Sequence, residues 1–357
     1  MTVSPPTPCL VVDVDVLDAN IAAMADRARS IGAGLRPHAK IHKSPDVARR
    51  QLAAGAHGLS VASVTEAESF AAAGFDDLFI AYPLWVDEAK AARLRVLLDN
   101  TTLSVGVDSA EAACALAAGL GHGQRSAVHM VIEVDSGHHR TGVAPELAGA
   151  LAEQVEAAGL GVAGVFTFPG HGYSPGVQVD VATQEAAALA TAAGALRSVG
   201  VEPRVVSGGS TPTAGSTTTG AITEMRPGVY VFGDAQQWEL GTTPPQSVAL
   251  TCLATVVSHS NGHVVLDSGS KALGADRPTW ATGYGRLLDH PAARIVALSE
   301  HHAVVEWPDQ SLPHLGSRLR VVPNHVCNAV NLADELVVLS AGTMVDRWPV
   351  SARGANT

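Results

Sequence analysis

The first two-thirds of the chain repeats one local pattern, in which a short β-rich run leads through a turn into an Ala-rich helical run. Strands that alternate with helices form parallel sheets, and eight strands are the number that a closed (β/α)8 barrel requires. A doubly wound open sheet is the competing architecture, but the number of runs favours the barrel. We expect its strands at residues 35–39, 58–62, 78–81, 102–107, 128–134, 161–167, 204–207 and 224–232.

The helical runs between these strands carry many alanines and leucines. We expect them at residues 46–54, 64–73, 87–98, 110–118, 145–158 and 179–199. Glycine commonly follows the end of a helix because it adopts a positive φ without strain. The glycines that we expect at helix ends are Gly55, Gly74, Gly119, Gly159 and Gly200.

After about residue 241 the sequence changes to β-rich runs separated by short Gly, Asn or Pro turns, and clear helical runs are absent. We expect strands at residues 247–257, 263–267, 303–306, 319–322 and 335–339. This pattern predicts an antiparallel β domain, to which residues 9–14 can add a strand. The prediction is therefore a barrel at 14–240 and a β domain at 241–357 together with 1–13.

The amino-acid composition argues against some classes of binding partner. The chain has 34 acidic and 23 basic residues, a formal net charge of −11, and no basic run, which argues against nucleic acid or an anionic membrane. No apolar stretch approaches the roughly 20 residues that a membrane span needs, and no secretory signal is recognisable. Four widely spaced cysteines do not suggest a disulfide framework. We expect a soluble cytoplasmic protein.

Two of the four lysines, Lys40 and Lys43, lie in the segment RPHAKIHK, directly after the first expected strand. Active sites of these barrels lie at the C-terminal ends of the strands. A lysine that is partly desolvated and close to other cations can form a Schiff base. Taken alone, such a segment is more often a solvated basic turn, so its meaning depends on the other strand ends.

Polar segments also follow the fifth, sixth, seventh and eighth expected strands. A Gly/Ser/Thr loop after the seventh offers backbone N–H groups and hydroxyls to a phosphate, and phosphate sites after strands seven and eight recur in these barrels. Together with a lysine after the first strand, these segments indicate pyridoxal phosphate. The candidate residues are Arg140, His171, Tyr173, Ser207, Gly208, Gly209, Ser210, Thr211, Gly228, Val229 and Tyr230.

A second candidate site lies in the β domain, in the segment PNHVCN. On the strand edge that we expect there, His325 and Cys327 point to the same side. Imidazole and thiolate suit Zn²⁺ or a similar ion, and two ligands leave room for the water or substrate of a catalytic metal. The segment SEHH at 299–302 supplies further candidate ligands. Taken alone, His-x-Cys is more often a core histidine near a buried cysteine.

Together these segments resemble the fold type III pyridoxal-phosphate enzymes, specifically the D-threonine aldolase and D-serine dehydratase group. The resemblance covers essentially the whole chain, through RPHAKIHKS, EVDSGHHRTGV, SGGSTPT, EMRPGVYVFGD, LDSGSKALGAD, LSEHHAVVE and PNHVCNAVNL. It implies a barrel like that of alanine racemase, a metal-binding β domain and a homodimer. The sequence SEHH departs from the family's usual glutamate-glutamate-histidine and leaves His302 at the matching histidine.

The resemblance also implies roles for individual residues. Lys40 would form the Schiff base with pyridoxal phosphate, and Arg140 would contact the cofactor's phenolic oxygen. The segment 207–211, with Gly228 and Val229 after the eighth strand, would hold the phosphate, and Tyr230 is a further candidate for binding the cofactor. His325 and Cys327 would bind a divalent metal, namely zinc, manganese or magnesium. His171 and Tyr173 fall near the cofactor, in a segment that varies within the family.

The implied activity is that of a lyase acting on D-β-hydroxy-α-amino acids. We expect, by a narrow margin, retro-aldol cleavage of D-threonine-like substrates to glycine and an aldehyde, because the barrel motifs resemble those of D-threonine aldolases. The alternative is a D-serine or D-3-hydroxyaspartate dehydratase that releases a 2-oxo acid and ammonia, which Cys327 favours. An amino-acid racemase is a second alternative. It needs another base, often a tyrosine of the β domain, where only Tyr284 lies.

Overall fold

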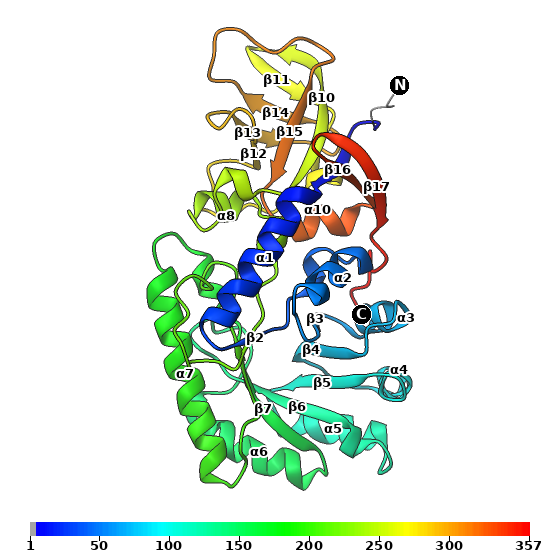
Figure 1. Cartoon of the computed structure of the whole chain (residues 1–357), viewed down its shortest axis with the longest axis vertical. Coiled ribbons are helices and arrows are strands. Elements are labelled where there is room, and N and C mark those ends of the chain that lie inside the picture. The colour runs from blue at the N-terminus through cyan, green and yellow to red at the C-terminus, as the bar shows by residue number, and fades with distance from the viewer. Residues whose placement is uncertain (1–4) are drawn as a thin grey trace. The chain divides into compact units, whose positions relative to one another are not determined.

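The computed structural model describes residues 5–357 (Figure 1). Packing divides the chain into two compact units. Unit 1 comprises the described part of Met1–Ala23 with Ile41–Arg50 and Val229–Gly354, and unit 2 comprises Met24–Lys40, Gln51–Gly228 and Ala355–Thr357. The domain division at residues 240 and 241 stays a prediction, and its part on residues 1–4 lies outside the described residues.

Unit 2 contains an eight-stranded sheet in which every neighbouring pair is parallel. Its order is β2-β9-β8-β7-β6-β5-β4-β3. A parallel bridge between His38 and Ser60, with the Ser60 N–H donating to the Pro37 carbonyl at 2.9 Å, joins the first and last strands. The (β/α)8 barrel is confirmed. Its strands are β2 (Gly34–Leu35), β3 (Leu59–Val61), β4 (Asp77–Pro83), β5 (Thr102–Val107), β6 (Val128–Glu133), β7 (Gly161–Phe166), β8 (Val205–Gly208) and β9 (Glu224–Met225).

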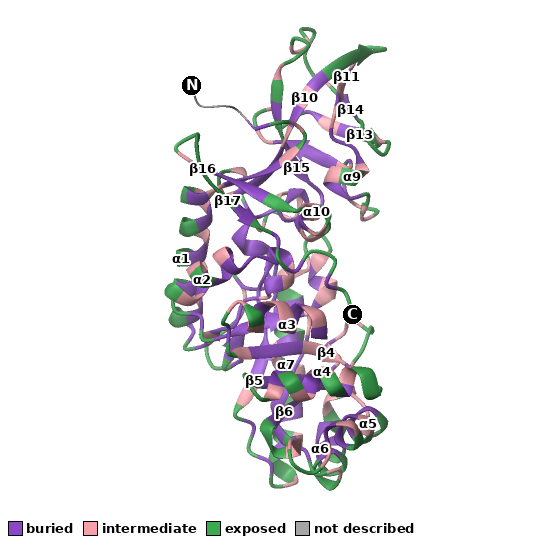
Figure 2. Cartoon of the chain, turned by 90° about the vertical axis from the view of Figure 1, so that its right-hand side faces the viewer, coloured by how far each residue is buried: buried purple, intermediate pink, exposed green. Residues whose placement is uncertain are grey.

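The barrel strands are mostly buried, and the helices that alternate with them expose one face to solvent (Figure 2). Ser63, Asp87 and Ser109 begin three of these helices by accepting a hydrogen bond from a backbone N–H of the first turn. The sequence analysis missed the first helix of the chain. The helices up to the end of the barrel are α1 (Val14–Ser30), α2 (Pro45–Ala53), α3 (Val64–Ala72), α4 (Glu88–Leu98), α5 (Ala110–Leu120), α6 (Ala148–Ala157) and α7 (Gln178–Ser198).

Four of the five glycines expected at helix ends adopt a positive φ, between 84° and 106°. Gly119 is the exception, because it lies inside α5, whose last residue is Leu120. Gly121, with a φ of 69°, follows that helix instead. A virtual Cβ on Gly119 would lie 2.5 Å from the Cβ of Ala91, so this glycine allows α5 to approach α4 closely.

Unit 1 contains a nine-stranded sheet of order β11-β14-β13-β12-β15-β10-β1-β16-β17. Its pairs are antiparallel except for β1 with β16, and a further pairing of β10 with β11 closes six strands into a barrel. The predicted antiparallel domain is confirmed, including the N-terminal strand. Its strands are β1 (Cys9–Asp13), β10 (Leu250–Ser260), β11 (His263–Leu266), β12 (Gly285–Leu287), β13 (Arg294–Leu298), β14 (Ala303–Glu306), β15 (Arg318–Pro323), β16 (Glu335–Ser340) and β17 (Thr343–Pro349).

The expectation that this domain lacks helices is wrong. Two helices, α9 (Ser270–Leu273) and α10 (Val326–Leu332), lie after residue 241, and α8 (Ala235–Glu239) precedes that point in unit 1. Asp234 helps to start two of them, because its buried carboxylate accepts from the N–H groups of Gln237 at 2.8 Å and Val326 at 3.2 Å. These helices are too short to leave a periodic pattern in the sequence. No helix in the described part of the chain could cross a membrane.

Candidate functional site

Phe168, just after β7, brings together side chains from three strand ends of unit 2. The ammonium of Lys40, which follows β2, lies 5.7 Å from the centre of the Phe168 ring. The guanidinium carbon of Arg140, which follows β6, lies 5.0 Å from the same point, and the His138 ring meets it edge-on at 5.7 Å. Two cations against one aromatic ring fit an anionic, planar cofactor such as pyridoxal phosphate.

His171 and Tyr173 belong to the same cluster. The imidazoles of His138 and His171 stack with 6.4 Å between ring centres, and Tyr173 lies 6.2 Å from Phe168. His171 Nε2 pairs with Gln184 Oε1 at 3.0 Å, while its Nδ1 is buried without a hydrogen bond to any described residue. Burial, with Arg140 and His171 nearby, lowers the pKa of His138. The sequence analysis did not single out His138, although it lies within the quoted segment EVDSGHHRTGV.

Glu133, at the end of β6, lies beneath the Arg140 loop. Its Oε1 accepts from the Thr141 hydroxyl at 2.9 Å and lies 3.9 Å from the Arg140 guanidinium. Its Oε2 is buried without a hydrogen-bond partner among residues 5–357. Burial raises the pKa of Glu133. The sequence analysis missed this residue, which connects the rim arginine to the barrel interior.

The predicted phosphate residues Ser207–Thr211 span the end of β8 and the loop that follows it. Gly209 has a φ of +81°, which favours glycine, and its N–H donates to Glu185 Oε1 at 2.6 Å. The Ser210 N–H donates to the Thr213 hydroxyl at 3.0 Å. The Ser207 hydroxyl faces the barrel interior instead, since it donates to Glu224 at 2.6 Å and accepts from Arg226 at 2.8 Å.

The second predicted phosphate segment follows β9. The Arg226 N–H donates to the Gly208 carbonyl at 2.8 Å, which places the end of β9 beside the loop after β8. Gly228 then leads into the short helical turn Val229–Val231, which includes Tyr230. The first N–H groups of such a turn find no acceptor within it. The N–H groups at the start of this turn therefore remain candidates for binding an anion, as predicted for Gly228 and Val229.

The barrel interior below this rim holds a charged network. Glu224 pairs with Arg36 Nε at 2.7 Å and with His57 Nε2 at 2.8 Å. Burial alone would raise the pKa of Glu224, but hydrogen bonds from His57 and Ser207 and the charge of Arg36 lower it to about 2. Arg226 is also buried and lies over the Phe166 ring at 5.1 Å. These residues fix the strand ends that carry the candidate site.

His325 and Cys327 lie at the start of α10 in unit 1. The prediction of a strand edge is wrong, because the chain is extended at His325 and becomes helical at Val326. The charge of a nearby Cys327 thiolate is the main reason why the pKa of His325 lies well above its usual value, so the two side chains lie close together. Imidazole nitrogen and thiolate sulfur are donors that a divalent ion accepts.

Asp276 orients His325. Its Oδ2 lies 2.8 Å from His325 Nδ1, and its Oδ1 is buried without a hydrogen bond to the described residues. A carboxylate on one imidazole nitrogen leaves the other nitrogen for a metal. The sequence analysis missed Asp276, although it ends the quoted segment LDSGSKALGAD. Within residues 5–357, no three His, Cys, Asp or Glu side chains form a metal cluster, so water or substrate would complete the coordination.

The segment 299–302 does not supply the further ligands that we expected. It forms the turn between β13 and β14, in which the Ser299 N–H donates to the His302 carbonyl at 2.9 Å. The carboxylate of Glu300 pairs with Lys271 at 2.6 Å, and His302 is exposed. The turn packs tightly against Gly269, where a virtual Cβ would lie 2.4 Å from the Glu300 carbonyl carbon. Its role in the structure is therefore to join two turns of the β domain.

Comparison with models of protein families shows to which family the chain belongs. The model for the alanine racemase N-terminal domain matches residues 12–236, and the model for a putative serine dehydratase domain matches residues 249–339. The chain belongs to the alanine racemase N-terminal domain family. The expected resemblance is confirmed, and the two matches fall on either side of the predicted division at residue 240.

Characterised relatives span nearly the whole of this racemase-like chain. D-threo-3-hydroxyaspartate dehydratase of Delftia sp. strain HT23 is 35% identical over 367 residues, which covers 96% of each chain. D-threonine aldolase of Arthrobacter sp. is 35% identical over 360 residues, with 98% of this chain and 93% of the aldolase covered. The structure of the Delftia dehydratase matches with a TM-score of 0.89 at 34% identity, covering 97% of both chains.

A solved D-threonine aldolase from Filomicrobium marinum gives a similar match. Its TM-score is 0.87 at 31% identity, with 99% of this chain and 97% of the aldolase covered. Both activities, dehydration and aldol cleavage, belong to lyases. This member of the alanine racemase N-terminal domain family is therefore an enzyme of the lyase class.

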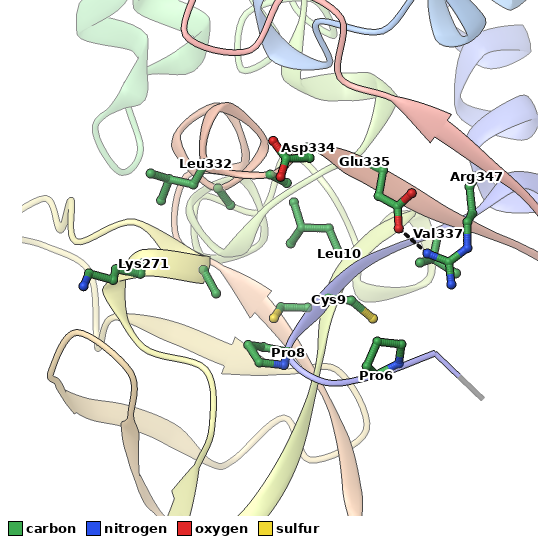
Figure 3. A pocket seen from close by; sticks show the side chains of 14 residues that line it. Pro6, Pro8, Cys9, Leu10, Lys271, Leu332, Asp334, Glu335, Val337 and Arg347 are labelled. Carbon is green, nitrogen blue, oxygen red and sulfur yellow. Dashed lines mark hydrogen bonds and ion pairs between the residues drawn. The ribbon is translucent and has the colours of Figure 1, made fainter. Parts of the chain in front are cut away.

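A cavity of about 350 Å³ in unit 1 of this racemase-like lyase is lined by residues of β1, β16, β17, α9 and α10 (Figure 3). Glu335 and Arg347 form an ion pair at one side, and Lys271 lies across from them (Figure 3). None of the predicted cofactor or metal residues lines it. The cavity is therefore separate from the candidate site.

Proposed function

We propose that the protein is a pyridoxal-phosphate- and metal-dependent lyase acting on D-β-hydroxy-α-amino acids. The juxtaposition of Lys40 and Arg140 on Phe168 is the observation that carries this proposal. When bound, pyridoxal phosphate supplies an electron sink for negative charge at the substrate Cα. A divalent ion on His325 and Cys327 supplies a Lewis acid for the β-oxygen. The Cys327 sulfur favours zinc over manganese or magnesium.

The chain's own residues divide the remaining work. Lys40 provides the amine that holds the cofactor and can move a proton at Cα. Arg140 provides a positive charge. The Glu133 carboxylate lies 3.9 Å from its guanidinium and helps to hold it in place. The Phe168 ring lies against both cations and holds them on the same side of the barrel rim. Asp276 holds the His325 ring so that one nitrogen faces outward.

Retro-aldol cleavage to glycine and an aldehyde is our first choice. This reaction needs a base to take the proton of the β-hydroxyl. His138 lies beside Phe168 and, because burial and neighbouring cations lower its pKa, it is neutral and basic near pH 7. The stacked His171 packs against the His138 ring and helps to hold it beside Phe168. The position of His138 therefore supports aldol chemistry.

Dehydration to a 2-oxo acid and ammonia is the alternative, with D-serine or D-3-hydroxyaspartate as substrate. Solved forms of the Delftia dehydratase include a metal-free cysteine-to-alanine variant and a variant of a histidine two positions earlier. The same spacing separates His325 and Cys327 here. For an amino-acid racemase we find no comparable support, since the Tyr284 ring is covered by Arg277 at 5.2 Å. The homodimer that the resemblance implies, and the cytoplasmic location expected from the composition, complete the proposal.

Product analysis tests the proposal. The holoenzyme with added Zn²⁺ is incubated with D-threonine, D-serine and D-3-hydroxyaspartate, with L-threonine as the stereochemical control. An aldolase converts D-threonine to acetaldehyde and glycine, whereas a dehydratase yields 2-oxobutanoate and ammonia. Dominance of ammonia and the oxo acid would replace our first choice with the alternative. Absence of any product from all D-substrates would refute both reactions.

A further inference from the structure

Glu185 on α7 is a buried carboxyl group to which the proposed reaction assigns no role. Glu185 as a whole is 2% exposed to solvent. Its Oε1 accepts from the backbone N–H of Gly209 at 2.6 Å. A virtual Cβ on the preceding Gly208 would also lie 2.6 Å from this oxygen. The carboxyl group therefore lies against Gly208 and Gly209, two consecutive residues of the predicted phosphate segment Ser207–Thr211.

The shape of this loop depends on that contact. Gly209 has a φ of +81°, and its N–H is directed to Glu185 by the short hydrogen bond. Without an acceptor at this position, a buried N–H would lose its partner, which costs about 1–3 kcal/mol. Glu185 is therefore suited to hold the loop in one conformation.

The charges around Glu185 are few. Arg226, after β9, is the charged side chain whose field reaches it within the described residues. The elements packed against α7, namely α6, β7, β8 and the turns Pro145–Leu147 and Gly170–Tyr173, bring no other charge into range. Burial raises the pKa of Glu185 to about 7. A phosphate dianion on the opposite side of the loop would favour the neutral form further, because like charges repel.

We propose that Glu185 positions the loop Ser207–Thr211 for the cofactor's phosphate and becomes more fully protonated, with net uptake of protons from solvent, when that phosphate binds. This inference rests on the proposed function, because it assumes that the loop holds the phosphate of pyridoxal phosphate. Proton uptake makes the affinity for a phosphate-bearing ligand fall as pH rises above 7. The affinity for a ligand without phosphate lacks this dependence.

The test compares pyridoxal phosphate with pyridoxal. Both react with Lys40, so the ratio of their affinities for the apoprotein, measured from the absorbance change, cancels the titration of that lysine. Glu185→Gln keeps a hydrogen-bond acceptor and removes the charge. Glu156→Gln, at an exposed position of α6, is the matched control.

If phosphate raises the pKa of Glu185 by one unit, we expect the preference for pyridoxal phosphate over pyridoxal to fall about sevenfold between pH 6 and 8.5 in the wild type, relative to Glu185→Gln. Glu156→Gln should follow the wild type. The same pH dependence in Glu185→Gln and the wild type would overturn the inference while leaving the proposed function intact. Failure of both ligands to react with Lys40 would overturn the proposed function and the inference with it.

A measurement on the wild type alone keeps the inference testable if Glu185→Gln does not fold. Calorimetry at pH 7.5 in two buffers of different ionisation enthalpy gives the number of protons taken up on binding. Pyridoxal phosphate should take up roughly half a proton more than pyridoxal, as expected for a group that titrates near this pH. Equal uptake by the two ligands would overturn the inference.

Discussion

Replacing Glu224 with glutamine removes a negative charge from the interior of the barrel. The carboxylate accepts hydrogen bonds from Arg36 at 2.7 Å and from the Ser207 hydroxyl at 2.6 Å, and it pairs with His57 at 2.8 Å. In the variant Glu224→Gln, the buried Arg36 guanidinium keeps Asp77 as its carboxylate partner. A buried guanidinium that has lost one of two carboxylates is expected to destabilise the barrel.

The size of the expected loss of stability in Glu224→Gln follows from the pKa of Glu224. Burial opposes ionisation, yet the hydrogen bond from His57 and the charge of Arg36 lower the pKa from its ordinary 4.5 to about 2. This difference corresponds to about 3 kcal/mol of stability, within the range found when one partner of a buried ion pair is removed. Because the folded-state pKa is depressed, this stabilisation is complete above pH 4.5 and is lost as pH falls toward 2.

Urea unfolding followed by far-ultraviolet circular dichroism measures the effect. We expect Glu224→Gln to lower the free energy of unfolding by about 3 kcal/mol at pH 7 and by about 1 kcal/mol at pH 3. Glu202→Gln removes the same charge from an exposed pair with Arg197, and should cost less than about 1 kcal/mol. Wild-type stability of Glu224→Gln at pH 7, or an equal loss at both pH values, would refute this reasoning.

Three other outcomes follow from the site and the fold. The holoenzyme should be yellow, and borohydride reduction followed by peptide mapping should place the adduct on Lys40; an adduct on another lysine would contradict the assignment. Chelation, or the double variant His325→Ala/Cys327→Ala, should abolish turnover and leave the visible absorbance unchanged; full activity of the metal-free variant would argue against a catalytic metal. Ser63→Ala should lower the stability by about 1 kcal/mol in urea unfolding, because the Ser63 hydroxyl accepts from the Glu66 N–H at 3.0 Å.

The sequence by itself determined the barrel and the rim. Most of the short β-rich runs that lead into Ala-rich runs form a strand and a helix, as local patterning predicts. The first and eighth expected strands are shorter than predicted, because only Gly34–Leu35 and Glu224–Met225 pair in the sheet. Once the strands are parallel, their C-terminal ends must meet at one rim, whatever the details of packing. Lys40 and Arg140 therefore lie near one another although 100 residues separate them, and both contact Phe168.

Only the tertiary structure decided what holds these residues in place. Arg36 and Glu224 are 188 residues apart, and Asp276 and His325 are 49 apart, so no local pattern links either pair. The helix that begins after His325 depends on the remote carboxylate of Asp234, which is why the expectation of a strand failed. Contacts of this kind arise because buried charges must find partners, and the fold alone decides which partners are within reach.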